Sequence, residues 1–255
     1  MVEEKLSFTL RPAETHADLL LACRVRAAAY GRKNPAYGES MLVPDATDAS
    51  PWTTVFLCED KLGGEPIGTA RVQATTRGGE IEIEKYVEPP EHIRRYGRAE
   101  ISRLSAVFGA DPLVRLALWK ASYLYCLAIQ ARWMVLGVGK PSLLRAYESL
   151  GASDIFADRH QVVLGHGGNK PYRILGLEIT MCEQRMRAQN HQLCGFMFDT
   201  VHRDISVVPG PRAPERPTPA VPPVRVAKDA SVHRDVAEEV RLHVVDGARE
   251  RVEGV

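Results

Sequence analysis

The chain has 255 residues, of which 45% are hydrophobic and 25% are charged, and its formal net charge is +1. This balance is typical of one globular domain, or of one domain with a tail, and the even spread of Lys and Arg argues against nucleic acid as a partner. No apolar run approaches the roughly 20 residues that cross a bilayer, and the N-terminus lacks the pattern of a secretion signal. We therefore predict a cytoplasmic protein without a stable membrane span.

The first half of the chain combines one helical pattern with several strand patterns. Apolar side chains recur every three or four residues from Thr15 to Tyr30, which predicts a helix with Arg26 on its inward side. Gly, Pro, Asp and Ser dominate 31–51 and indicate a long loop. Runs of β-branched and apolar residues, the first two joined by a hairpin turn, predict strands at 53–58, 66–74, 80–83 and 99–107.

The second half alternates helices with strands. Asp111 and Pro112 are typical first residues of a helix, and its leucines are expected to form the buried face: Leu113, Leu116, Leu124 and Leu127. A second helix is predicted over 141–150, ended by Gly151. The remaining apolar runs predict strands at 131–138, 161–164 and 172–180. This order of elements predicts an α/β sandwich, in which helices pack on a mixed sheet.

The C-terminal part differs in composition from the rest. Seven of the 17 prolines fall between Pro209 and Pro223, and proline removes backbone donors and fixes φ. We predict a folded domain over 1–208, a Pro-rich linker over 209–226, and a charged amphipathic tail over 227–255 that is either helical or disordered.

One strand pattern, Arg98 to Val107, contains charges within an apolar run. Glu100 and Arg103 stand three residues apart there, and buried charges cost several kcal/mol unless they are paired or used in chemistry. The two residues are candidates for catalysis, and a structural ion pair at a strand end is an equally good interpretation. Ideal alternation places Glu100 and Ser102 on one face and Arg103 on the other, so convergence of both charges requires a bulge or a strong twist.

A wider set of three bases and three acids lies near the ends of the predicted elements. The order and spacing of this set, with the sequence Glu-Ile-Ser-Arg-Leu-Ser-Ala-Val at its end, resemble the autoinducer-synthase branch of the GNAT-like acyltransferases: Arg26, Asp45, Asp48, Arg71, Glu100 and Arg103. The resemblance covers about Leu6 to Thr180. It is stronger to long-chain N-acyl amino acid synthases than to acyl-homoserine-lactone synthases, because no aromatic residue lies between the paired aspartates and Tyr30 is the aromatic residue nearby.

The resemblance implies a GNAT-like N-acyltransferase domain over 1–208. Such an enzyme transfers a fatty acyl group from the thioester of acyl carrier protein, or less often of coenzyme A, to the amine of an amino acid or a related small molecule. No bound cofactor or metal is implied. The segment Phe108 to Pro112 lacks the Gly-rich pyrophosphate loop of ordinary coenzyme A enzymes and offers an acidic helix cap, which favours a carrier protein as donor.

Roles for individual residues follow from the resemblance. Glu100 is expected to act as the general base, directly or through water, with Arg71 and Arg103 as further catalytic residues. The acceptor amine is expected to bind near five residues, Arg26, Tyr30, Asp45, Asp48 and Ser102. Contacts to the acyl chain or pantetheine are expected from Leu104, Ser105, Val107 and Val138.

Two other interpretations stay open. The chain could instead be an acyl-homoserine-lactone-type signal synthase, which belongs to the same class. It could also be a non-catalytic module that binds an acyl chain or a carrier protein and retains only the fold. A monomer and a homodimer are both compatible with the sequence.

Overall fold

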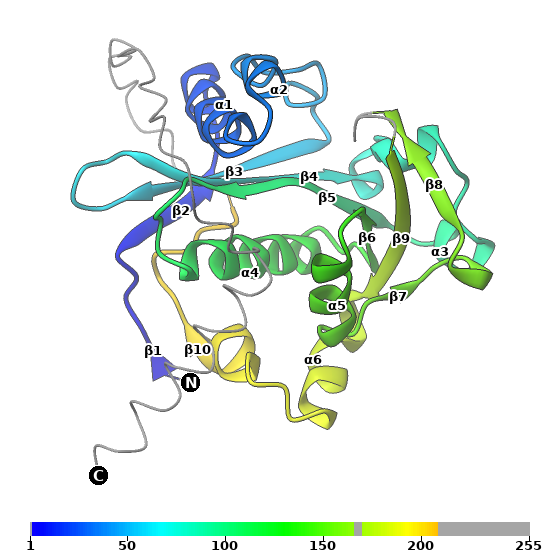
Figure 1. Cartoon of the computed structure of the whole chain (residues 1–255). Coiled ribbons are helices and arrows are strands. Elements are labelled where there is room, and N and C mark those ends of the chain that lie inside the picture. Colours follow the sequence, from blue (N-terminus) through cyan, green and yellow to red (C-terminus); the bar gives the residue numbers. More distant parts are fainter. Residues whose placement is uncertain (1, 166–169, 209–255) are drawn as a thin grey trace.

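The computed structural model describes residues 2–165 and 170–208 (Figure 1), so the predicted linker over 209–226 and tail over 227–255 lie outside the described residues. The strands are β1 Val2–Glu3, β2 Phe8–Pro12, β3 Thr53–Asp60, β4 Pro66–Ala74, β5 Arg98–Ala106, β6 Trp133–Val138, β7 Ser153–Asp154, β8 Gln161–Leu164, β9 Lys170–Glu178 and β10 Thr200–Val201. The α-helices are α1 His16–Gly31, α2 Pro35–Glu39, α3 Glu91–Arg94, α4 Leu113–Ala128, α5 Pro141–Ser149 and α6 Ile179–Ala188.

A mixed sheet forms the centre of the fold. Its strand order is β2-β3-β4-β5-β6-β9-β7, and β8 also pairs with β9. Neighbouring strands are antiparallel except β5 and β6, which are parallel because α4 crosses over between them. None of the helices in the described part of the chain is long and apolar enough to span a membrane.

Alternation along β4 and β5 gives this part of the sheet two chemically different faces. One face is apolar and packs against α4 in the main hydrophobic core, through Ala70, Val72, Ala99 and Ile101. The residues between them, including Arg71 and Glu100, point to the opposite face, which α1 and α2 cover (Figure 1). The sequence pattern therefore directs the charged residues to the α1 side of the sheet.

A β-bulge in β5 changes which side chains reach that face. Thr69 pairs with Ser105 and Arg71 pairs with Ser102, so β5 carries one residue more than β4 over this stretch. Arg103 lies within the bulge and has a φ of 56°, in the left-handed region that non-glycine residues rarely adopt. A bulge, one of the two irregularities that convergence of Glu100 and Arg103 would require, is thus present.

The ladder between β5 and β6 is short. It comprises the pairs Arg98 with Trp133, Ala99 with Met134 and Glu100 with Val135, although β5 continues to Ala106 and β6 to Val138. After Glu100 the two strands are no longer paired to each other, and the sheet opens at its centre.

The C-terminal segment of the described chain is attached to α4 by a buried lysine. Lys120 is 4% exposed, and its ammonium donates to the carbonyl oxygens of Phe196 at 2.6 Å and Thr200 at 2.7 Å. The same ammonium lies 3.1 Å from Nδ1 of His202. These bonds hold residues 196–202 beneath the core.

Most predicted elements are confirmed, and three expectations are corrected. The expected strand at 80–83 is a 3₁₀ helix, Glu82–Lys85; Ile81 and Ile83 suggested alternation because both are buried in a second core cluster. The expected loop at 31–51 contains α2, which Asn34 caps by accepting from the Tyr37 N–H.

The buried face of α4 is also different from the expected one. Leu127 is 42% exposed, whereas Val114, Ala117, Leu118 and Ala121 are buried against the sheet. Small alanines let the helix approach β4 and β5 closely, so the predicted leucines lie at the flanks of the contact.

Candidate active site

Arg71 is the centre of a buried charged cluster on the α1 side of the sheet. Its side chain has 0% exposure, and all three guanidinium nitrogens are bonded. Nε donates to Ser102 Oγ at 3.1 Å, Nη1 to both carboxylate oxygens of Asp45 at 3.0 and 2.9 Å, and Nη2 to Glu82 Oε2 at 3.2 Å. Arg71 therefore fixes the positions of three partners, and each of its three nitrogens already has an acceptor.

Arg26 and Asp48 form a second buried pair beside Arg71. Nη1 of Arg26 lies 2.6 Å from Asp48 Oδ2, and the two side chains are 2% and 1% exposed. The other oxygen of Asp48 lies 3.5 Å from Arg71. Nε and Nη2 of Arg26 are buried and have no hydrogen-bond partner. A buried unpaired donor costs about 1–3 kcal/mol, so this edge of the guanidinium needs an explanation.

Asp45 lies on the solvent-exposed side of the cluster. The Asp48 N–H donates to its carboxylate at 2.8 Å and the Asp45 N–H donates back to Asp48 at 3.2 Å, which fixes the turn that carries both residues. The side chain of Asp45 is 47% exposed. Burial alone would raise the pKa of Asp45, but the positive charge of Arg71 and the hydrogen bonds lower it below its ordinary value. Asp45 therefore presents a negative charge to solvent.

Glu100 lies deeper, opposite the 3₁₀ helix Glu82–Lys85. It is 2% exposed, and its Oε2 accepts from the Ile83 N–H at 2.8 Å. Burial raises the pKa of Glu100 from 4.5 to about 7; the Ile83 hydrogen bond opposes this shift, and the neighbouring Glu82 carboxylate adds to it. A carboxyl group with this pKa can take up and release a proton near neutral pH.

The bulge brings Arg103 to the same face, where it contacts tyrosines. Its Nη1 donates to Tyr37 Oη at 2.5 Å, and the ring of Tyr37 packs edge-on against Tyr30 with centroids 5.5 Å apart. Glu100 and Arg103 do not bond to each other, so the interpretation as a structural ion pair is wrong. They occupy separate parts of one site.

The residues expected to contact the donor follow the point where β5 and β6 separate. Leu104 is partly buried against the main core, and Ser105 Oγ donates to the Arg103 carbonyl oxygen at 3.2 Å. Val107 comes just after β5, and its N–H donates to the Ile67 carbonyl oxygen at 3.0 Å. Val138 is the buried last residue of β6. The opening of the sheet is therefore bordered by these residues.

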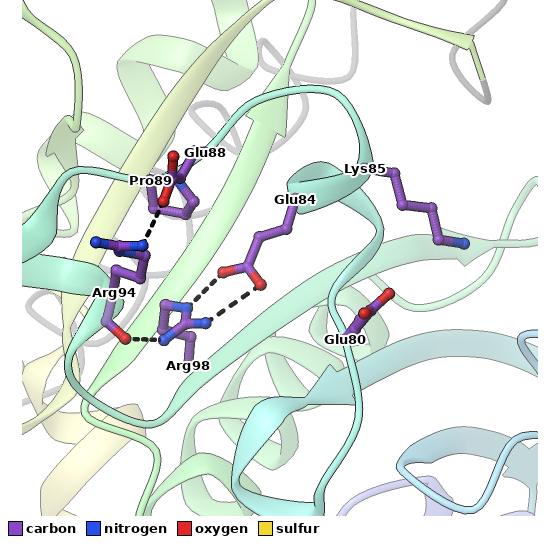
Figure 2. Close-up of a pocket in the computed structure, with 7 residues that line it drawn as sticks. All are labelled: Glu80, Glu84, Lys85, Glu88, Pro89, Arg94 and Arg98. Atoms are coloured by element: carbon purple, nitrogen blue, oxygen red, sulfur yellow. Dashed lines mark hydrogen bonds and ion pairs between the residues drawn. The ribbon is translucent and has the colours of Figure 1, made fainter.

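A surface hollow of about 390 Å³ lies elsewhere, between the 3₁₀ helix, α3 and the start of β5 (Figure 2). Figure 2 shows that Arg98 is bound to Glu84 and to the Arg94 carbonyl oxygen, while Arg94 is bound to Glu88. Four of its charged groups are thus paired with one another. No residue of the Arg71 cluster lines this hollow, so we do not assign the chemistry to it.

Two members of the site were not predicted from the sequence. Glu82 stands in a run of alternating Glu and Ile that resembles a strand, and Tyr37 stands in the predicted loop. The pair Asn34 and Pro35, a helix start, is the signal that could have located Tyr37 on a helix.

No protein-family model matches the sequence, and neither does any curated protein. Solved structures do match. The N-acyl amino acid synthase FeeM, from uncultured soil microbes, has a TM-score of 0.53 and 16% identity over 74% of this chain and 98% of that chain. The coenzyme A-dependent acyl-homoserine lactone synthase BjaI, with S-adenosylmethionine and isopentyl-coenzyme A, has a TM-score of 0.53 and 16% identity over 81% of this chain and 95% of that chain. The predicted fold is confirmed, because the chain shares its mixed-sheet α/β architecture with FeeM and BjaI.

Proposed function

We propose that this chain is an N-acyltransferase, which transfers a fatty acyl group from a carrier-protein or coenzyme A thioester to the amine of an amino acid. The observation that carries the proposal is Glu100, a buried carboxyl group with a pKa of about 7 at the point where β5 and β6 separate. The similarity of the fold to FeeM and BjaI supports it, since those proteins are acyl-transferring synthases by name.

The reaction requires a base because an amino acid carries an ammonium group in neutral solution. Glu100 takes one proton from it, directly or through one water, and the freed nitrogen attacks the thioester carbonyl carbon. The tetrahedral intermediate collapses as the C–S bond breaks and the C–N bond remains, and the nitrogen gives up its second proton, which passes to the leaving sulfur. The thiolate that leaves takes up a proton, so the products are an amide and a free thiol.

The acceptor is placed by the outer part of the cluster. Asp45 carries an exposed negative charge that suits the ammonium, and an arginine fork suits the carboxylate of an amino acid. Arg71 and Asp48 act as positioning residues, because Arg71 donates to Asp45 and Ser102 and the Asp48 N–H donates to the Asp45 carboxylate. Arg103, with Tyr30 beside its partner Tyr37, organises the side of the cluster next to the strand opening.

In this proposal the donor arm lies where β5 and β6 separate after Glu100. Pantetheine is an extended chain with amide groups, and diverging strands offer backbone donors and acceptors along their facing edges. At the start of α4, the Asp111 carboxylate already accepts from the Leu113 N–H at 2.8 Å. A pyrophosphate at this helix start would meet a negative charge, which favours a carrier protein over coenzyme A.

The test is product identification with purified protein. The protein is incubated with long-chain acyl carrier protein or acyl-coenzyme A, a pool of amino acids and S-adenosylmethionine, and products are identified by mass spectrometry. N-acyl amino acids support the proposal, and an acyl-homoserine lactone supports the signal-synthase alternative. Donor binding without product from any acceptor supports a binding module. Glu100→Gln should abolish turnover and leave donor binding nearly intact, whereas Glu59→Gln, on β3, should leave turnover unchanged.

A further inference from the structure

Gln73 carries a buried polar atom that the proposed function does not use. The residue lies on β4 and is 2% exposed, and its side-chain oxygen Oε1 has no hydrogen-bond partner among the residues that the structure describes. Its Nε2 donates to the Glu80 carbonyl oxygen in a long hydrogen bond of 3.5 Å. The reverse orientation of the amide would bring two acceptor oxygens together there, so Oε1 belongs on the other side. A buried acceptor without a donor is unfavourable, so this oxygen needs an explanation.

The residue directly opposite Gln73 in the sheet is Glu100. Side chains that face each other on antiparallel strands share one face of the sheet, with Cβ atoms about 4.5–5.5 Å apart. Glu100 is also 2% exposed, and its Oε2 accepts from the Ile83 N–H at 2.8 Å. The amide of Gln73 and the carboxyl group of Glu100 are therefore buried neighbours.

Glu100 in its protonated form needs an acceptor of the kind that Gln73 offers. A protonated carboxyl carries one O–H, which requires an acceptor when it is buried. The charged side chains that act on Glu100 are Arg71 from β4 and Glu82 from the 3₁₀ helix, and its partner on β6, Val135, is apolar. Arg71 is a donor, and the Glu82 carboxylate already accepts from it at 3.2 Å. The unused acceptor beside Glu100 is Oε1 of Gln73.

We infer that Gln73 is a positioning residue for the general base, because its Oε1 accepts the O–H of protonated Glu100 and so holds the proton that Glu100 takes from the acceptor. The inference rests on the proposed function for the identity of the base. In this step an N–H bond of the ammonium breaks and the O–H bond of Glu100 forms, while Gln73 keeps its own bonds. When Glu100 is ionised, the same oxygen faces a carboxylate, and two acceptors repel each other. Gln73 therefore favours the protonated form and makes Glu100 a stronger base.

The test is the pH profile of kcat/KM in wild type and Gln73→Met. A general base works only when it is ionised, so kcat/KM falls on the acid side of the profile, below the pKa of Glu100. Methionine fills a similar volume and has no amide oxygen. The midpoint of the acid limb should therefore move to lower pH by about 1 unit, which is about a tenfold loss of proton affinity.

The direction of this shift separates the inference from a role in packing. If Gln73 only fills space, the more apolar methionine should raise the pKa of the buried carboxyl, and the midpoint should move to higher pH. A midpoint that stays in place or moves to higher pH in Gln73→Met would overturn the inference. Gln73→Leu, a second variant without an acceptor, should repeat the shift to lower pH.

Gln161→Met is the matched control on another strand. Gln161 is the exposed first residue of β8, so this substitution should leave the midpoint unchanged. A shift as large as that of Gln73→Met would show that the effect is not specific to the neighbour of Glu100, and the inference would fail.

Carbon-13 NMR of the side-chain carboxyl carbons separates the inference from the proposed function. The Glu100 signal is identified by its absence in Glu100→Gln and is followed against pH in wild type and Gln73→Met. If no acceptor is acylated, the proposed function fails, and a lower midpoint for Glu100 in Gln73→Met still supports the hydrogen bond. An unchanged or higher midpoint overturns it.

Infrared difference spectra of wild type between acid and alkaline pH do not depend on how a variant at position 73 folds. The C=O band of protonated Glu100, identified by its absence in Glu100→Gln, should lie at the low frequency of an acid whose O–H is hydrogen-bonded. A band at the higher frequency of an acid with a free O–H would overturn the inference.

Discussion

Glu100→Gln should stabilise the fold above neutral pH while it removes activity. Burial raises the pKa of Glu100 from 4.5 to about 7, so the folded state holds this proton more tightly than the unfolded chain does. At about 1.4 kcal/mol per pKa unit, ionising Glu100 above pH 7 lowers the free energy of unfolding by up to about 3 kcal/mol. In wild type the Ile83 N–H donates to the Glu100 carboxylate at 2.8 Å. A glutamine side chain keeps an oxygen that accepts this hydrogen bond, and it does not ionise.

The direction of the pH effect determines at which pH values the stability of wild type and Glu100→Gln should be compared. Wild type loses stability as pH rises from 4.5 to about 7, so the advantage of Glu100→Gln should be near zero below this window and largest above it. Urea unfolding at about pH 4.5 and about pH 8 measures the difference. Glu59→Gln is the control, because Glu59 is a buried carboxylate paired with Arg11 at 3.1 Å and its removal should give no stabilisation. A difference that does not change with pH would refute the reasoning.

The remaining predictions concern three other parts of the cluster and core. Asp48→Asn removes the charge that is paired with the buried Arg26, and it should lower the free energy of unfolding in urea by about 3–5 kcal/mol. Asp45 is half exposed, so Asp45→Asn should lower this free energy by less than about 1 kcal/mol and should reduce acyl transfer instead. Equal losses of stability in the two variants would contradict the argument from burial. Arg103 has a φ of 56°, which glycine adopts more easily than alanine, so Arg103→Gly should be more stable than Arg103→Ala by about 0.5–1 kcal/mol. Activity should be lowered in both variants. The reverse order of stability in thermal unfolding would show that the bulge is not strained. Burial lowers the pKa of Lys120 from 10.5 to about 8, so the unfolded chain binds this proton more tightly. The free energy of unfolding of wild type, minus that of Lys120→Met, should therefore increase as the pH is raised from about 8 to 10.5. A difference that does not change with pH would exclude this titration.

The elements that the sequence predicted well are those in which local pattern and burial agree. The helix from Thr15 places Arg26 inward, and the alternation of β4 directs Arg71 to the face opposite the apolar core. The sequence left open whether a bulge or a strong twist brings Arg103 to the face of Glu100, and the register of β4 and β5 shows that it is a bulge.

Other features depend on tertiary contacts that the sequence does not encode locally. The segment around Ile81 and Ile83 alternates like a strand, but it forms a 3₁₀ helix whose Ile83 N–H donates to Glu100, which is distant in sequence. The edge strand β2 has no strong turn signal beside it and was not predicted. The unpaired edge of Arg26 depends on where Asp48 lies in three dimensions, so no sequence pattern reveals it.

The short seam between β5 and β6 has a consequence for the kinetics of donor binding. Only three residue pairs join two half-sheets, β2 to β5 on one side and β6 to β9 on the other. Under the proposed function, a donor arm that enters beyond Glu100 breaks no strand pair, so we expect binding without separation of the two half-sheets. The association rate should then be set by diffusion and orientation, and differences in affinity among donors should lie in how fast they leave.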